Sequence, residues 1–108
     1  MRINIKPLSV NQAWKGRRFK SDIYKKYEKE LLFMLPNIEI PAGKLELNVT
    51  FGLSSKLSDY DNPLKVFQDV LCKKCGFDDR RIYKGVIVKV DVKKGQEFIE
   101  FHIKKYII

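Results

Sequence analysis

The chain has 108 residues, 44% of them hydrophobic and 32% charged, and a formal net charge of +9. This length predicts one domain over residues 1–108, and the composition excludes a disordered tail and a membrane protein. Basic and acidic residues number 9 and 3 in residues 1–30, 2 and 4 in 31–62, and 11 and 6 in 63–108. A basic protein with a locally acidic stretch indicates a polyanion surface around a site of another kind, although a merely soluble basic protein would share this charge.

The first part of the chain predicts a strand, a basic loop and a helix. Alternation over Arg2–Lys6 predicts the strand, which ends in a turn at Pro7. Residues 9–20 are polar and basic, which predicts a loop, with or without a short two-stranded ribbon. Ser21 is a good helix N-cap, the apolar residues after it recur at helical spacing, and Pro36 ends the helix.

A strand and a second helix come next. Lys44–Ser54 alternates strictly between apolar and polar residues, which predicts a half-buried strand. After a polar loop, Asn62 as N-cap and Pro63 at the first helical position predict a helix that ends before Gly76.

The end of the chain predicts a hairpin. Ile82–Val92 and Glu97–Lys105 both alternate, and a turn through Gly95 separates them. The resulting order, β-α-β-α-β-β, predicts an α+β fold in which a mixed, mostly antiparallel sheet packs against two helices. Because a chain this short has a thin core, a dimer that shares its core would stabilise it.

Two carboxylates two residues apart, Asp59 and Asp61, lie in the acidic stretch. In an extended segment they would point to the same side, about 6.6 Å apart along the chain. Hard cations such as Mg²⁺ or Mn²⁺ bind carboxylate oxygens of this kind. The alternative is a loop whose aspartates only form turns and caps.

Lys65 lies near the third position of the second predicted helix, where the helix dipole disfavours a cation. A phosphate near the helix start, or charge on a leaving oxygen, would explain it. The alternative is a solvated lysine whose stem covers apolar surface. Asp69 is four residues after Lys65 and four before Lys73, so we expect it to form an i,i+4 ion pair.

A second acidic pair, Asp78 and Asp79, is followed at once by Arg80, Arg81 and Lys84. One interpretation is a solvated loop with weak local ion pairs. The other is a third metal-binding carboxylate beside arginines that contact phosphate.

Taken together, these residues form a spaced pattern. It reads Asp59-x-Asp61-Asn62-x-x-Lys65, then Asp69, Gly76-Phe77 and Asp78-Asp79-x-x-Ile82. The pattern resembles the signature of the RusA-type Holliday junction resolvases, small endodeoxyribonucleases of bacteria and their phages. The resemblance is close over residues 58–84. It extends more loosely to Ser9-x-Asn11-x-x-Trp14 and Gly16-Arg17-Arg18, which look like the basic N-terminal loop of that family.

The resemblance implies a dimeric, Mg²⁺-dependent and structure-selective DNA endonuclease that resolves four-way junctions by paired nicks in recombination and repair, with Mn²⁺ able to replace Mg²⁺. It implies metal-binding carboxylates at Asp59, Asp61 and Asp79, with Asp78 as an adjacent candidate, and Lys65 as an essential basic partner. No small-molecule cofactor is implied. Since nothing argues for export or a membrane segment, we expect the cytoplasm of a bacterial cell, with a chromosomal or phage gene.

The expected chemistry is phosphodiester hydrolysis by a metal-bound hydroxide, with Lys65 neutralising charge on the phosphate or the leaving group. The one histidine, His102, lies in the last predicted strand, away from the acidic residues. Two alternatives stay open. One is a non-catalytic basic DNA-binding protein on the same scaffold, and the other is a nuclease or binder directed to RNA.

Phosphate contacts should make DNA binding fall steeply with salt. The candidate contacts are Lys15, Arg17, Arg18, Lys20, Arg80, Arg81 and Lys84. Trp14 and Tyr60 could stack on unpaired bases, although core packing or a plain surface contact is the simpler role for either.

The predicted second helix raises a geometric question, because Asp61 precedes it and Asp79 follows it. A helix from Pro63 to Cys75 would be about 20 Å long. Residues 76–79 can reach back at most about 13 Å. The loop before the helix could cover the remaining distance between Asp61 and Asp79, or the helix could be shorter. The third possibility is that Asp79 comes from the partner chain of an intertwined dimer.

Overall fold

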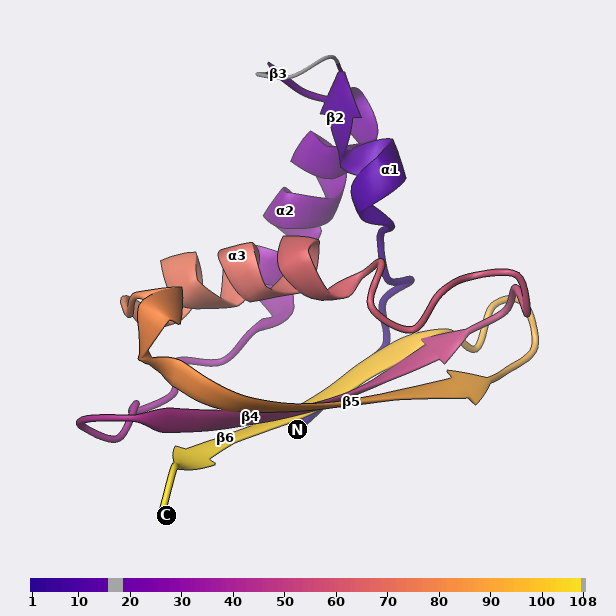
Figure 1. Ribbon diagram of the computed structural model, residues 1–108. Helices are drawn as coiled ribbons and strands as arrows, with labels where there is room; N and C mark the ends of the chain where they lie inside the picture. Colours follow the sequence, from indigo (N-terminus) through magenta and orange to yellow (C-terminus); the bar gives the residue numbers. More distant parts are fainter. Residues whose placement is uncertain (16–18, 108) are drawn as a thin grey trace.

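The computed structural model describes residues 1–15 and 19–107. It is a compact α+β fold with a mixed sheet, which confirms the predicted fold class. Figure 1 shows the helices of the described residues stacked on one side of the sheet. The elements in chain order are β1 (Arg2–Ile3), α1 (Val10–Ala13), β2 (Trp14–Lys15), β3 (Phe19–Lys20), α2 (Asp22–Met34), β4 (Leu45–Leu53), α3 (Leu64–Cys75), the 3-10 turn η1 (Asp79–Arg81), β5 (Ile82–Asp91) and β6 (Phe98–Lys105).

The main sheet has the strand order β1-β6-β4-β5. β4 pairs in parallel with β5 and antiparallel with β6, and β1 pairs antiparallel with β6. The predicted hairpin is therefore wrong, because β5 and β6 lie on opposite sides of β4. β4 is buried over most of its length, whereas most of β5 is exposed. The most buried strand thus takes the central position with two neighbours, and β5 takes an edge.

The N-terminal segment differs from the prediction in two ways. The strand ends early, because the Ile5 N–H donates to the Ile3 carbonyl and turns the chain. The basic segment begins with the short helix α1, which the sequence did not predict and whose N-cap is Ser9. The two-stranded ribbon exists, with Trp14 opposite Lys20. Gly16, Arg17 and Arg18 lie outside the described residues.

Local signals locate the two long helices. The Ser21 hydroxyl accepts a hydrogen bond from the Tyr24 N–H at 3.1 Å, which confirms the predicted cap of α2. The predicted Asn62 cap of α3 is wrong. The cap position is Pro63 instead, and it has no side-chain hydrogen bond. The predicted end of α3 is confirmed, because Gly76 follows it in the left-handed conformation with φ 68°.

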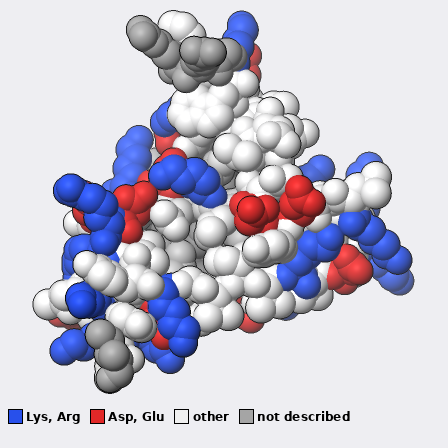
Figure 2. Space-filling model, in the orientation of Figure 1, with Lys and Arg blue, Asp and Glu red and all other residues white. Residues whose placement is uncertain are grey.

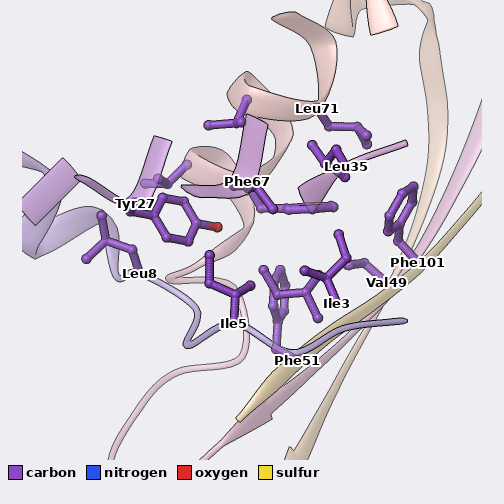
Figure 3. Packing of buried hydrophobic residues seen from close by; sticks show 14 of the residues in the cluster. Ile3, Ile5, Leu8, Tyr27, Leu35, Val49, Phe51, Phe67, Leu71 and Phe101 are labelled. Carbon is purple, nitrogen blue, oxygen red and sulfur yellow. The ribbon is translucent and has the colours of Figure 1, made fainter. Parts of the chain in front are cut away.

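The core lies between the helices and the inner face of the sheet (Figure 3). The Phe67 ring from α3 meets Phe51 of β4 and Phe101 of β6 edge-on, with centroids 6.0 and 5.4 Å apart. The Tyr27 side chain enters the core from α2, and its hydroxyl has no hydrogen-bond partner among the described residues. Burial therefore raises the pKa of Tyr27 well above its ordinary value.

The outer face of the sheet is more polar. Glu46 of β4 is only 8% exposed there, since the ammonium groups of Lys84 and Lys104 approach it to 3.7 and 3.5 Å. At the other end of β4, the Phe98 ring lies over Gly52, where a Cβ atom would come within 2.3 Å of the ring. No helix in the described part of the chain is both long enough and apolar enough to cross a membrane.

Candidate metal centre and nucleic-acid surface

Lys65 is the centre of a charged cluster on α3. Its Nζ lies 2.9 Å from Asp69 Oδ1 and 3.2 Å from Asp79 Oδ2. The Gln68 amide donates to the same Asp79 oxygen at 3.3 Å. The expected pair between Lys65 and Asp69 is confirmed. The hydrogen bonds to Asp69 and then to Asp79 raise the pKa of the Lys65 ammonium.

Asp79 reaches this cluster because the chain reverses at the end of α3. The N–H groups of Gly76 and Phe77 both donate to the Cys72 carbonyl, which folds the chain back beside the helix. Asp79 then opens η1 and contacts residues of the first half of α3. The long Lys65 side chain spans the remaining gap. The contact between Lys65 and Asp79 therefore needs no partner chain.

Asp59 and Asp61 lie in the turn that precedes α3, and both are exposed. The Asp59 carbonyl accepts from Asn62 N–H at 3.3 Å, and the Asp61 carbonyl accepts from Leu64 N–H at 3.1 Å. The pair is thus in a curled backbone, and the expectation of an extended segment is wrong. The turn forms because these carbonyl groups satisfy N–H groups at the start of α3.

Both sides of this turn are attached to the rest of the fold. The Lys89 ammonium of β5 donates to the carbonyls of Ser58 at 2.7 Å and Lys56 at 3.2 Å. At the other end, the Asn62 carbonyl accepts from the Val10 N–H of α1 at 3.0 Å. Sequence reasoning missed the role of Lys89. The one signal in the sequence is that a charged residue occupies an inward-facing position of an alternating strand, where an apolar residue is expected.

The three predicted metal ligands are not gathered into one cluster. Within residues 1–15 and 19–107, no group of three or more His, Cys, Asp or Glu side chains is arranged to hold a metal ion. Asp79 contacts Lys65 instead, and Asp59 and Asp61 occupy the turn just before the helix that carries Lys65. The chemistry of the donor set still suits Mg²⁺, because all three side chains are carboxylates.

Asp78 has a different environment. Its Oδ1 caps η1 by accepting from the Arg80 N–H, and its Oδ2 accepts from the Arg80 guanidinium at 2.9 and 3.1 Å. The guanidinium contact, followed by the backbone hydrogen bond, lowers the pKa of Asp78. Asp78 thus forms the local ion pair that one interpretation of the sequence expected.

The candidate phosphate contacts are distributed around this region, and Figure 2 shows basic side chains on both flanks of the face that carries acidic groups. Arg17 and Arg18 lie outside the described residues. Lys15 is exposed on the ribbon. The other candidates contact groups of the same chain: Lys20 contacts Glu28, Arg80 contacts Asp78, Arg81 donates to the carbonyls of Gly43 and Pro41, and Lys84 faces Glu46.

Exposed apolar side chains accompany the charges. Trp14 is 41% exposed and meets the Tyr24 ring edge-on at 5.5 Å, while Tyr60 is 56% exposed in the acidic turn. Leu57, in the loop held by Lys89, is 94% exposed. Sequence reasoning missed Leu57, although a leucine inside a polar loop was a visible signal. These side chains are available for stacking or packing against a partner.

No model of a known protein family matches the sequence, and a search of curated proteins found no match.

Proposed function

We propose that this protein is a Mg²⁺-dependent, structure-selective endodeoxyribonuclease that resolves four-way DNA junctions by paired nicks, in recombination and repair within a bacterial cytoplasm. The observation that supports it most is the contact between Lys65 and Asp79. The two residues belong to separate parts of the sequence pattern that resembles RusA-type resolvases, and the fold of a single chain brings them together.

Asp59, Asp61 and Asp79 would hold the metal ion. When bound, Mg²⁺ supplies charge for the phosphoryl oxygens and lowers the pKa of a water molecule. With Asp79 on the ion, Lys65 would be free to contact the leaving oxygen and to neutralise charge there. His102 belongs to the outer face of the sheet, opposite the helices, where it pairs with Asn48. It therefore takes no part as a base.

The DNA partner and the dimer belong to the same proposal. The net charge of +9 supports attraction to phosphate backbones, and exposed Lys15 supplies one contact outside the internal ion pairs. A two-fold dimer suits a four-way junction, because symmetric strands can then be cut by symmetric sites. The edge strand β5 supports a second copy as its neighbour, since Val86, Val88 and Val90 are each about 40% exposed on it.

A non-catalytic DNA-binding protein is the second candidate. It is favoured by the ion pairs of Asp79 with Lys65 and of Asp78 with Arg80, because carboxylates satisfied by cations of the same chain need no metal. The two candidates differ in one measurable property, which is cleavage of DNA in the presence of Mg²⁺.

The test uses a labelled four-way junction, a linear duplex and an RNA hairpin, each with and without Mg²⁺. We expect paired nicks in the junction that require Mg²⁺ and are lost in Asp61→Asn while binding is kept. Asp91→Asn, an exposed aspartate at the end of β5, is the matched control and should cut normally. Junction binding without cutting would favour the second candidate, and faster cleavage of RNA would contradict the choice of DNA.

A further inference from the structure

A pocket of about 370 Å³ opens beside the acidic turn. Ser58 and Asn62, which flank Asp59 and Asp61, line one wall. The other lining residues come from the N-terminal segment, including Gln12, and from the end of β4 and the loop after it, including Ser55. The turn that carries the two carboxylates therefore also forms part of an open pocket.

The lining of this pocket combines polar and apolar groups and has little free charge. Hydroxyl and amide groups can both donate and accept hydrogen bonds. Glu97 is the one carboxylate among the described lining residues, and it already accepts from the Ser54 hydroxyl and the Gly95 N–H, both at 2.8 Å. Lys6 is the one cation among them. A charged ligand group, whether an anion or a metal ion, would therefore find few side chains of opposite charge in this pocket.

Apolar surface completes the pocket. Pro7, Leu53 and Pro63 contribute flat or branched apolar groups between the polar ones. A neutral, planar ligand with hydrogen-bonding edges matches this combination, since its faces need apolar contact and its edges need donors and acceptors. A nucleobase is such a ligand, and the volume is large enough for one nucleoside.

We propose that this pocket binds the nucleoside next to the phosphate that is cut, with Gln12, Ser55 and Asn62 contacting the edge of its base. This inference rests on the proposed function, because it takes the position of the phosphate from Asp59 and Asp61. It assigns the base preference at the cut to Asn62 of the sequence pattern that suggested a nuclease, together with two residues outside that pattern, Gln12 of α1 and Ser55 of the loop after β4.

The experiment records amide spectra of the ¹⁵N-labelled full chain during titration with each of the four 5′-deoxynucleoside monophosphates and with deoxyribose 5-phosphate. We expect saturable shifts at Gln12, Ser55, Ser58 and Asn62 with at least one nucleotide, and none with the sugar phosphate. Gln12→Met, which keeps length and removes hydrogen bonding, should weaken that binding by about three- to tenfold. The exposed Gln96→Met is the matched control and should bind normally.

Equal shifts with deoxyribose 5-phosphate would overturn the assignment of a base, and so would an unchanged affinity in Gln12→Met. The absence of saturable shifts with all four nucleotides would overturn the pocket itself. These readouts need no cleavage. Nucleotide binding in a protein that fails to cut junctions would thus contradict the proposed nuclease function and support the nucleoside pocket. Cutting of junctions without nucleotide binding would support the nuclease function and contradict the pocket.

Discussion

The ammonium of Lys65 lies 3.2 Å from a carboxylate oxygen of Asp79, fourteen residues further along the chain. Lys65 belongs to the first turn of α3 and Asp79 to η1, which follows α3, so the contact joins two separate parts of the sequence pattern on which the proposed nuclease function rests. It also shows that the length of the helix does not separate them, because the chain folds back at Gly76.

Replacing Lys65 should separate catalysis from stability. Lys65→Met removes the charge, and we expect cleavage of the junction to fall by about 10²- to 10³-fold. The side chain is 60% exposed, so its ion pairs should contribute less than about 1 kcal/mol to the free energy of unfolding. Lys65→Arg is the control that keeps the charge. Cleavage by Lys65→Met within a factor of two of the parent protein would contradict a role in the reaction.

The attachment of the acidic turn by Lys89 gives a second prediction. Lys89→Met keeps the stem and removes both hydrogen bonds to the carbonyls of Lys56 and Ser58. We expect faster hydrogen exchange of the amides of residues 56–62 and a loss of about 1 kcal/mol in the free energy of unfolding. Lys93→Met, an exposed lysine beyond β5, should leave both unchanged. Exchange rates unaffected in Lys89→Met would show that the ammonium does not hold the turn.

Two glycines in neighbouring strands test the packing of the sheet. A Cβ atom at Gly52 would lie 2.3 Å from the Phe98 ring, whereas at Gly85 the nearest atom would be 3.9 Å away. We expect Gly52→Ala to lower the free energy of unfolding by about 1–3 kcal/mol, because the ring must move. Gly85→Ala should cost nothing. Urea denaturation measures both, and equal effects would contradict the described position of Phe98.

The Cys72 thiol makes stability depend on alkaline pH. Burial, with the nearby carboxylates of Asp79 and Asp69, raises the pKa of Cys72 from 9.0 to about 12. Between these values the unfolded chain loses the proton that the folded chain keeps, so the free energy of unfolding falls as pH rises from about 9 towards 12. We expect a shallower fall in Cys72→Ala. Parallel pH profiles for the two proteins would show that the thiol is not shielded.

The sequence predicted those parts of the fold that depend on neighbours in the chain. The Ser21 cap, the alternation of β4 and the glycine at the end of α3 all act within a few residues, and they locate these three elements correctly. The prediction that β4 is half-buried is wrong, because both of its faces are largely buried. The Lys65–Asp69 pair is of the same kind, because four residues make one turn of helix.

The strand order could not be predicted in this way. Alternation in β5 and β6 fits a hairpin as well as two strands on either side of β4. Which arrangement forms depends on which strand is the central one in the sheet, and that depends on contacts between distant parts of the chain. The contacts of Lys89 with the acidic turn and of Asp79 with Lys65 likewise depend on how separate elements pack. The convergence of Asp59 and Asp61 with Asp79 stays a prediction.

That convergence can be measured directly with Mn²⁺, which broadens the NMR signals of nearby nuclei. The ¹⁵N-labelled protein, bound to a four-way junction, is titrated with Mn²⁺ and compared with Asp79→Asn. We predict that the amides of residues 58–62 and of residues 78–80 broaden together at low Mn²⁺, and that Asp79→Asn weakens the effect on both segments. Broadening of neither segment, or of one without the other, would contradict a shared metal site and the proposed nuclease with it.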